Sequence, residues 1–293
     1  MRLVSVLRDG RRLAGALDGD RVLVSELDGG IDALIAAGAG AEAIDGAWQV
    51  AEDVVLDAAL RPPVVLCAGQ NYRDHLDEKA PVDVTEPEFF LKAGQTIAAP
   101  GDPCVLDPAV TSKLDYETEL GVVIGRGGRH IPAREAADHV YGYVVLNDLT
   151  ARDRQVIPGR DGGFAMALGP GKNFDGATRV AASLTPAAQL DGELDLRLTT
   201  SVEGELRQSN STAAMVFGVP ELIAYLSRLM TLRPGAVIAT GTPGGTGWGT
   251  DAELGGTSVT PAGCAPGRYL RPGDHVVSEI ERIGRLKFDV VGP

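Results

Sequence analysis

The sequence predicts an α+β fold that is rich in β-structure, with a small N-terminal domain ahead of a larger, sheet-rich body. Three observations support this prediction. Apolar runs of strand length recur along the chain, clusters of Gly, Pro and Asp separate them, and helical spacing is convincing in one segment only. With 293 residues, 44% of them hydrophobic, the chain is long enough to bury one large core.

The first part of the chain is expected to form a small α/β domain. Its predicted strands are joined by Asp-Gly turns and cover residues 3–7, 13–17 and 22–25. A short helix is expected over residues 31–44. Two consecutive prolines, Pro62 and Pro63, cannot continue a helix and lack ladder donors. We therefore place the domain boundary there, with residues 1–60 as the N-terminal domain and 61–293 as the larger one.

Strands and long loops dominate the predicted larger domain. The apolar runs of strand length cover residues 64–67, 120–124, 141–146, 194–200, 236–240 and 275–280. A helix is predicted over residues 220–230, where leucines and an isoleucine recur at helical spacing after Pro220. Two Gly-rich stretches, 157–171 and 243–272, are longer than ordinary connections and are typical of lids or binding loops. The second stretch can contain a short hairpin instead.

Charge and cysteine content exclude several classes of protein. The chain has 40 acidic and 27 basic residues, a net charge of -13, which repels nucleic acid and anionic membranes. A small anionic substrate would need a local positive site. Three cysteines without a CxxC pair indicate neither a disulfide framework nor a thiolate zinc site. The N-terminus lacks the pattern of a signal peptide and no apolar run reaches membrane-spanning length, so we expect a cytoplasmic protein.

Three carboxylates stand beside strongly apolar segments. Glu117 and Glu119 lie two positions apart, so an extended backbone projects both from one face, with Thr118 turned away. Asp148 ends a second apolar run. An all-oxygen set without His or Cys favours Mg2+, Mn2+ or Ca2+. An acidic pair at a strand edge is also often merely solvated, and that alternative stays open.

A histidine and a lysine are further candidates. His75 and Glu78 lie three positions apart, so one helical turn would place both on one face, where the carboxylate can orient the imidazole as a general base. A surface turn with a His-Glu contact explains the pair equally well. Lys172 can bind a substrate carboxylate or a developing oxyanion, although most lysines are only solvated.

Taken together and in order, these segments make the chain resemble the fumarylacetoacetate hydrolase family. The matching stretches include GQNYRDH at 69–75, PEFFLK at 87–92, LDYETELGVVIG at 114–125, NDLTARDRQ at 147–155, GKNFD at 171–175, LRPG at 232–235 and TGTP at 240–243. The likeness covers roughly residues 64 to 290. It implies a mixed, β-rich catalytic domain behind a small N-terminal domain, a Mg2+ or Mn2+ site and a homodimer.

The resemblance also implies roles for individual residues. Glu117, Glu119 and Asp148 become metal ligands, and His75 with Glu78 becomes a dyad that activates water. Lys172 becomes an oxyanion or carboxylate contact, and Arg152, Gln155 and Thr242 fall where family members contact substrate. Residues 244–270, which contain Trp248, can form a pocket wall, a dimer contact or a structural elaboration.

The leading hypothesis is a metal-dependent hydrolase that cleaves a carbon-carbon bond in a 1,3-diketo acid, such as an acylpyruvate or 2,4-diketo acid, and expels an enolate stabilised by the metal. An oxaloacetate-type decarboxylase, a 2-oxo-4-enoate hydratase or an isomerase could use the same site. A hypothesis of another class is a catalytically silent dimer that binds a metal or 2-oxo acid. No EF-hand loop, dinucleotide-binding GxGxxG or P-loop is present in the sequence.

Overall fold

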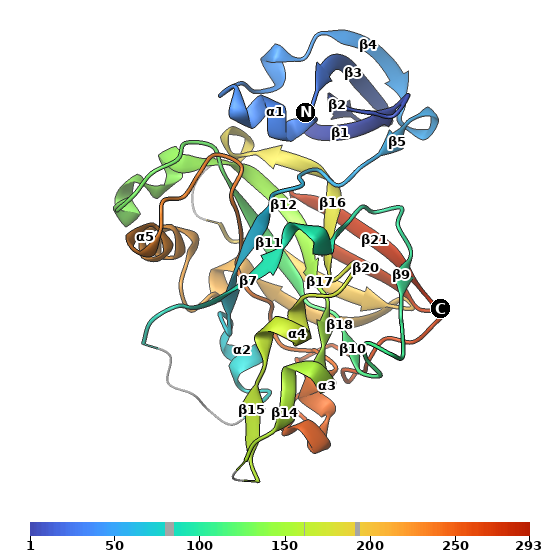
Figure 1. Ribbon diagram of the computed structural model, residues 1–293, viewed down its shortest axis with the longest axis vertical. Helices are drawn as coiled ribbons and strands as arrows, with labels where there is room; N and C mark the ends of the chain where they lie inside the picture. The colour runs from blue at the N-terminus through green and yellow to red at the C-terminus, as the bar shows by residue number, and fades with distance from the viewer. Residues whose placement is uncertain (80–84, 161, 191–193) are drawn as a thin grey trace.

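Two β-sheets form the frame of the molecule (Figure 1). The computed structural model describes residues 1–79, 85–160, 162–190 and 194–293. Within these residues, the larger sheet has the strand order β4-β3-β2-β1-β16-β12-β11-β19-β6-β7, with β5 added to β1 and β8 added to β16. The second sheet has the order β18-β17-β20-β21-β9. Antiparallel pairs prevail, but β19 runs parallel to β6, β8 to β16 and β9 to β21. The predicted β-rich, mixed architecture is confirmed.

The strands have the following bounds: β1 Arg2–Arg8, β2 Arg11–Asp18, β3 Arg21–Asp28, β4 Gly46–Val50, β5 Val55–Leu56, β6 Val64–Gly69, β7 Glu88–Ala93, β8 Ile97–Ala98, β9 Cys104–Val105, β10 Leu114–Asp115, β11 Thr118–Ile124, β12 Val140–Asp148, β13 Thr150–Ala151, β14 Val156–Pro158, β15 Phe164–Met166, β16 Thr178–Pro186, β17 Arg197–Val202, β18 Glu205–Ser211, β19 Val237–Ala239, β20 His275–Ile280 and β21 Gly284–Val291. The α-helices are α1 Ile31–Ala36, α2 Arg73–Leu76, α3 Arg152–Gln155, α4 Leu168–Lys172 and α5 Val219–Leu229.

The central strands are the most deeply buried. Every residue of β11 is buried, and its apolar side chains join one large core with those of β12, β16 and β19. Burial on both faces explains why these segments read as nearly continuous apolar runs in the sequence. The predicted helix is present as α5, whose buried residues include Leu222, Ile223 and Leu226.

The N-terminal strands gather at one end of the molecule, opposite the β14–β15 hairpin (Figure 1). They have a small core of their own, formed by Val4, Val6, Leu13, Val22 and Val24. Strand β1 also pairs with β16, so this end continues the main sheet. The division of the chain at residue 60 remains a prediction.

Three expectations of local structure were wrong. The helix expected over 31–44 ends at Ala36, because Gly38 adopts a positive φ of 64° that ends a helix; only a short 3-10 turn, Ala41–Ala43, follows. The strand expected from residue 194 begins at Arg197. In 243–272 the structure forms two 3-10 turns and no hairpin. The 157–171 stretch instead takes part in the β14–β15 hairpin and α4, although its residue 161 lies outside the described residues.

A candidate metal centre and active site

Antiparallel pairing of β11 and β12 brings the three predicted metal ligands together. Thr118 pairs with Asn147, so Glu117 and Glu119 on either side of Thr118 project from one face, beside Asp148. The backbone N–H of Asp148 donates to the carbonyl of Glu117 at 2.8 Å. One carboxylate oxygen from each of the three residues lies within 4.8 Å of the others, and all three residues are buried.

Thr118 points away from this cluster, as predicted. Its hydroxyl contacts Thr200 Oγ1 and Ser278 Oγ at 2.5 and 2.6 Å, on the second sheet. The alternation of side chains along β11 therefore separates a carboxylate face from a face that ties the two sheets together.

Two buried lysines partly neutralise the acidic cluster. Lys172 Nζ lies 2.5 Å from Glu117 Oε2 and 2.7 Å from Asp148 Oδ2. Lys92, which is fully buried on β7, donates to Asp148 Oδ1. Burial opposes ionisation of Glu117, but Lys172 and Arg152 hold the pKa of its carboxyl below the usual range. Lys92 was not among the predicted residues; a lysine inside the apolar run of β7 was the available signal.

Glu119 lacks such a countercharge. Its Oε2 accepts a hydrogen bond from Gly241 N at 2.8 Å, and no ion pair of its carboxylate occurs among the described residues. Burial, followed by the like charges of Asp148 and Glu117, raises its pKa well above the ordinary value. Three buried carboxylates with one uncompensated member suit a hard divalent cation, so the residues present fit Mg2+ or Mn2+.

The His75–Glu78 pair closes over one helical turn. His75 lies in α2, and its Nδ1 is 2.7 Å from Glu78 Oε2. The other carboxylate oxygen of Glu78 accepts from Gly245 N at 2.6 Å and Thr246 N at 2.9 Å. Both side chains are buried, so the surface-turn alternative does not describe this structure. A carboxylate on Nδ1 fixes the ring tautomer in which Nε2 is the base.

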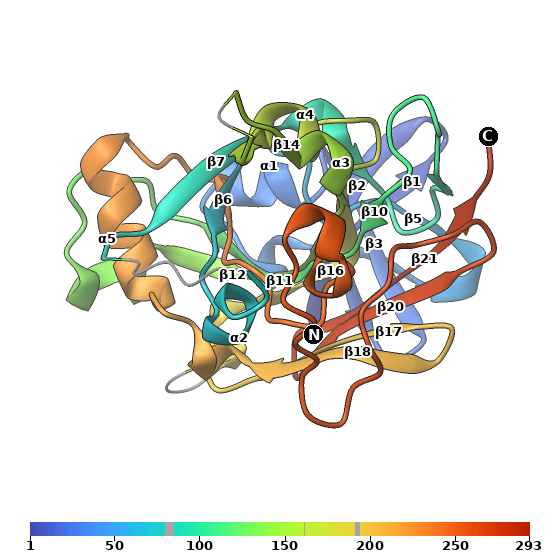
Figure 2. The same ribbon diagram turned by 90° about the horizontal axis from the view of Figure 1, so that it is seen from below.

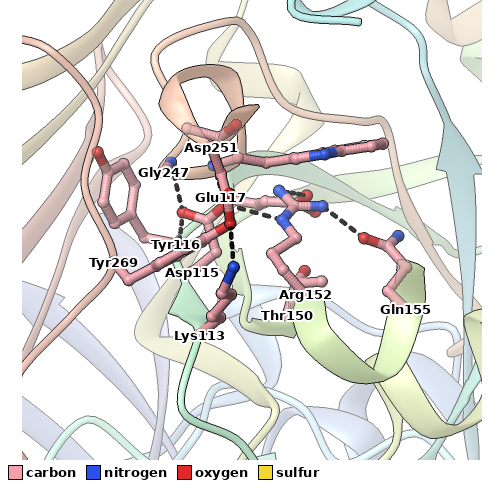
Figure 3. A network of polar contacts seen from close by, with 12 residues as sticks. Lys113, Asp115, Tyr116, Glu117, Thr150, Arg152, Gln155, Gly247, Asp251 and Tyr269 are labelled. Carbon is pink, nitrogen blue, oxygen red and sulfur yellow. Dashed lines mark hydrogen bonds and ion pairs between the residues drawn. The ribbon is translucent and has the colours of Figure 1, made fainter. Parts of the chain in front are cut away.

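Arg152 is held by protein groups on three sides (Figure 3). Its Nε donates to Asp115 Oδ2 at 2.7 Å, its Nη2 to Glu117 Oε1 at 2.5 Å and its Nη1 to Gln155 Oε1 at 2.7 Å. The resemblance implies substrate contacts for Arg152 and Gln155. In this structure the two residues bind each other, and both line the pocket beside the acidic cluster.

Asp115 is a site residue that the sequence prediction missed. It is fully buried and accepts hydrogen bonds from Gly247 N at 2.7 Å and Trp248 N at 3.0 Å, in addition to its ion pair with Arg152 (Figure 3). Burial raises the pKa of this carboxyl, against the opposing effect of Arg152. Asp115 precedes Glu117 by two positions, so the same alternation that pairs Glu117 with Glu119 could have pointed to it.

Thr242 lines the pocket, but its hydroxyl is already engaged. It donates to the carbonyl of Thr118 at 2.9 Å and accepts from Gln208 Nε2 at 2.8 Å. Because Thr242 donates its hydroxyl proton to Thr118, it cannot donate the same proton to a substrate without breaking this bond. Its role in substrate binding stays a prediction.

One pocket collects these groups. It is lined by the metal-ligand candidates Glu117 and Glu119, by His75 and Lys172, and by two residues that the sequence did not single out as site residues, Lys79 and Trp248. Trp248 belongs to the long β19–β20 loop, which crosses in front of β11 (Figure 2). Its ring centroid lies 6.4 Å from that of His75, in an edge-on arrangement. Of the alternatives for this loop, the structure therefore shows a pocket wall at Trp248.

Comparison with known proteins identifies the family of the chain. The family model described as "Fumarylacetoacetate (FAA) hydrolase C-terminal" matches residues 64–291. The chain belongs to the fumarylacetoacetate hydrolase family. It is an enzyme of a family whose members include hydrolases, isomerases and tautomerases.

The names of similar proteins and solved structures include more than one of these activities. The chain is 40% identical over 242 residues to the oxaloacetate tautomerase YisK of Bacillus subtilis, covering 81% of this chain and 73% of that protein. It is 37% identical over 240 residues to the human mitochondrial oxaloacetate tautomerase FAHD2A, covering 82% and 70%. The structure of a fumarylacetoacetate hydrolase from Exiguobacterium antarcticum matches with a TM-score of 0.79 and 32% identity over 100% of both chains.

No helix within the described residues is both long and apolar enough to cross a membrane. The three cysteines, Cys67, Cys104 and Cys264, are free thiols in this structure.

Proposed function

We propose that this enzyme is a Mg2+- or Mn2+-dependent tautomerase that interconverts the keto and enol forms of a 2-oxo dicarboxylic acid of the oxaloacetate class. The observation that carries the proposal is the placement of a carboxylate-anchored imidazole, His75, in the same pocket as a buried acidic cluster. Two relatives at 40% and 37% identity that are named oxaloacetate tautomerases support this choice of reaction.

Tautomerisation requires a base beside the substrate carbon and positive charge beside its oxygen. A cation held by Glu117, Glu119 and Asp148 would supply Lewis-acid polarisation of the 2-oxo group. His75 Nε2 takes the proton as the C3–H bond breaks and its electron pair forms the C2–C3 double bond. Glu78, on Nδ1, stabilises the resulting imidazolium. Return of a proton to the C2 oxygen completes the enol, so no atom is gained or lost.

Lys172 has a supporting role in this scheme. Its ammonium lies between Glu117 and Asp148, so it adds a fixed positive charge at the place where the substrate oxygen becomes negative. Protein donors that are already oriented need no rearrangement during the reaction. We propose the same role for Lys172 in any reaction of this site that proceeds through an enolate.

A second candidate is the hydrolytic cleavage of a 1,3-diketo acid, in which the His75–Glu78 dyad deprotonates water. The buried, hydrogen-bonded dyad favours it, because water activation needs an oriented base of this kind. The likeness to a fumarylacetoacetate hydrolase structure at 32% identity also supports it. Decarboxylation and hydration use the same groups but have no separate observation in their favour.

A product assay separates these reactions. The metal-stripped protein is incubated with oxaloacetate or an acylpyruvate, with and without Mg2+ or Mn2+, and products are followed by proton NMR. We expect metal-dependent exchange between keto and enol oxaloacetate without loss of carbon. Two acids formed from the acylpyruvate would favour the hydrolase, pyruvate and carbon dioxide from oxaloacetate a decarboxylase, and no metal-dependent change would refute an enolate-forming enzyme.

A further inference from the structure

The pocket contains three cationic side chains, and two of them are already paired. Arg152 binds Asp115 and Glu117, and Lys172 binds Glu117 and Asp148. Each of these cations therefore already has carboxylate partners before any substrate arrives. The third cation, Lys79, differs from them.

Lys79 is partly buried in the pocket wall, directly after Glu78. Its Nζ lies 5.0 Å from the centre of the Trp248 ring, and within the described part of the chain no hydrogen bond or ion pair to Nζ is formed. Burial, and then the charge of Arg152, lowers the pKa of Lys79 to about 8, while the charges of Glu88, Glu117 and Glu78 act in the opposite direction. Of the three cations in the pocket, Lys79 is therefore the one without a contacting anion among the described residues.

Trp248 holds this lysine and Arg152 against the same ring system. The guanidinium carbon of Arg152 lies 5.0 Å from the ring centre, the same distance as Lys79 Nζ. Trp248 is itself fixed, because its N–H donates to Asp115 and its indole Nε1 donates to the carbonyl of Leu254 at 2.9 Å. A fixed aromatic face limits the positions of a flexible ammonium, which reduces the entropy lost on binding an anion.

We propose that Lys79, positioned by Trp248, binds the distal carboxylate of a dicarboxylic substrate and gives the enzyme its preference for diacids over acids with an uncharged tail. This inference rests on the proposed function and names the part of the substrate that the metal centre does not bind. It also explains how a chain with a net charge of -13 can bind a dianion. Lys79, the only unpaired cation among the described pocket residues, would pair with the second carboxylate of the substrate.

The preference follows from the cost of leaving a desolvated charge unpaired. A diacid gives the Lys79 ammonium a charge-assisted hydrogen bond, whereas an ester in the same place leaves it without an anion. Discrimination of this kind, against an analogue that lacks the group a site is built to bind, is larger than discrimination by apolar contact. About tenfold or more in kcat/KM is expected.

The test compares oxaloacetate with its 4-methyl ester, which has the same reacting centre but no distal charge. For wild type, Lys79→Gln and Lys79→Arg, kcat and KM are measured on both compounds with saturating Mg2+. Lys287→Gln is the matched control, because Lys287 is exposed on β21 and its loss changes the net charge equally. We expect wild type, Lys79→Arg and the control to favour the diacid at least tenfold, and Lys79→Gln to lose that preference through KM with little change in kcat.

Binding measurements keep this inference separate from the proposed reaction. Calorimetric titration of the Mg2+-loaded proteins with the same two compounds needs no turnover, so it decides the role of Lys79 even if neither compound is converted. At least tenfold tighter binding of the diacid by wild type, lost in Lys79→Gln, supports the inference. Equal affinities in wild type, or an unchanged preference in a folded Lys79→Gln, overturn it.

Discussion

At the scale of single residues, the centre of the site is a balance of buried charge. Four buried carboxylates meet three buried cationic side chains, namely Asp115, Glu117, Glu119, Asp148, Lys92, Arg152 and Lys172. In the part of the chain that the structure describes, the carboxylate without a contacting cation is Glu119, which accepts a hydrogen bond from Gly241 N. A divalent ion bound there would remove the repulsion among the carboxylates, which is the physical reason to expect a metal.

Glu119→Gln separates folding from metal binding. The neutral amide keeps the shape of the side chain and removes a buried like charge, so the thermal midpoint of the metal-free protein should stay equal or rise. The affinity for Mg2+ should fall by about 100-fold, since a neutral oxygen replaces a carboxylate. Calorimetric titration with Mg2+ and a thermal unfolding curve check both parts. Unchanged Mg2+ affinity would remove Glu119 from the ligand set.

His75→Ala isolates the base. General-base catalysis typically contributes about 10²- to 10⁴-fold, so turnover should fall by that factor. The affinity for Mg2+ should change little, because His75 is not among the acidic ligands. Steady-state kinetics on oxaloacetate and Mg2+ titration provide the two values. Near-full turnover in this variant would sink the role of His75.

The preference for the diacid over the ester should depend on pH through the charge of Lys79. Burial and the charge of Arg152 lower the pKa of Lys79 to about 8, against the opposing charges of Glu88, Glu117 and Glu78. The side chain is therefore charged below that pH and neutral above it. The ratio of kcat/KM for the diacid to that for the ester should therefore decline as pH rises through about 8, since kcat/KM reports groups of the free enzyme. In Lys79→Arg the ratio should stay constant through this pH range, because arginine remains charged. If the ratio in that variant declines as it does in wild type, another group titrates.

At the scale of elements, two buried carboxylates, Glu78 just after α2 and Asp115 on β10, tie the β19–β20 loop to the walls of the pocket. Glu78 accepts from the backbone of Gly245 and Thr246, and Asp115 from that of Gly247 and Trp248. The loop contains two 3-10 turns and no strand, and these hydrogen bonds, together with that from Trp248 Nε1 to Leu254, hold its aromatic side chain in place.

Asp115→Asn tests this tether. The substitution removes the charge that compensates Arg152 and leaves that buried cation short of a partner, which should lower the free energy of unfolding by about 3 kcal/mol. Urea denaturation measures the change. The exposed Asp175→Asn removes the same charge at the surface and should shift stability by less than about 0.5 kcal/mol. Equal stabilities of the two variants would show that Asp115 does not hold the loop.

Local patterns predicted much of this architecture, and long-range contacts explain the rest. Alternation along β11 was enough to pair Glu117 with Glu119, because side-chain direction in a strand is a local property. The positions of Lys79 and Trp248 could not be read in this way, since 169 positions separate them in the sequence and only folding brings them together. The overlong helix prediction over 31–44 failed because a single glycine conformation at Gly38 ended it.

At the scale of the whole molecule, the assembly implied by the family resemblance is a homodimer. Sedimentation velocity should give a mass near twice the 30.5 kDa of one chain. The measured mass should not depend on salt if apolar contacts hold the chains together, because screening weakens only charge pairs. A mass of one chain at micromolar concentration would contradict the expectation.

The whole-molecule charge also makes the function dependent on a few local cations. A net charge of -13 repels a dianion at long range, so our proposal assigns its binding to the metal centre and Lys79, which act at short range. In our proposal, the metal and His75 act together on a 2-oxo diacid. The most direct test of this proposal is the rate at which the ultraviolet absorbance of enol oxaloacetate decays, measured for metal-free and Mg2+-loaded protein. We predict a rate above the spontaneous one only for the Mg2+-loaded protein, and lost in His75→Ala; a rate equal to the spontaneous one with Mg2+ present would contradict the account.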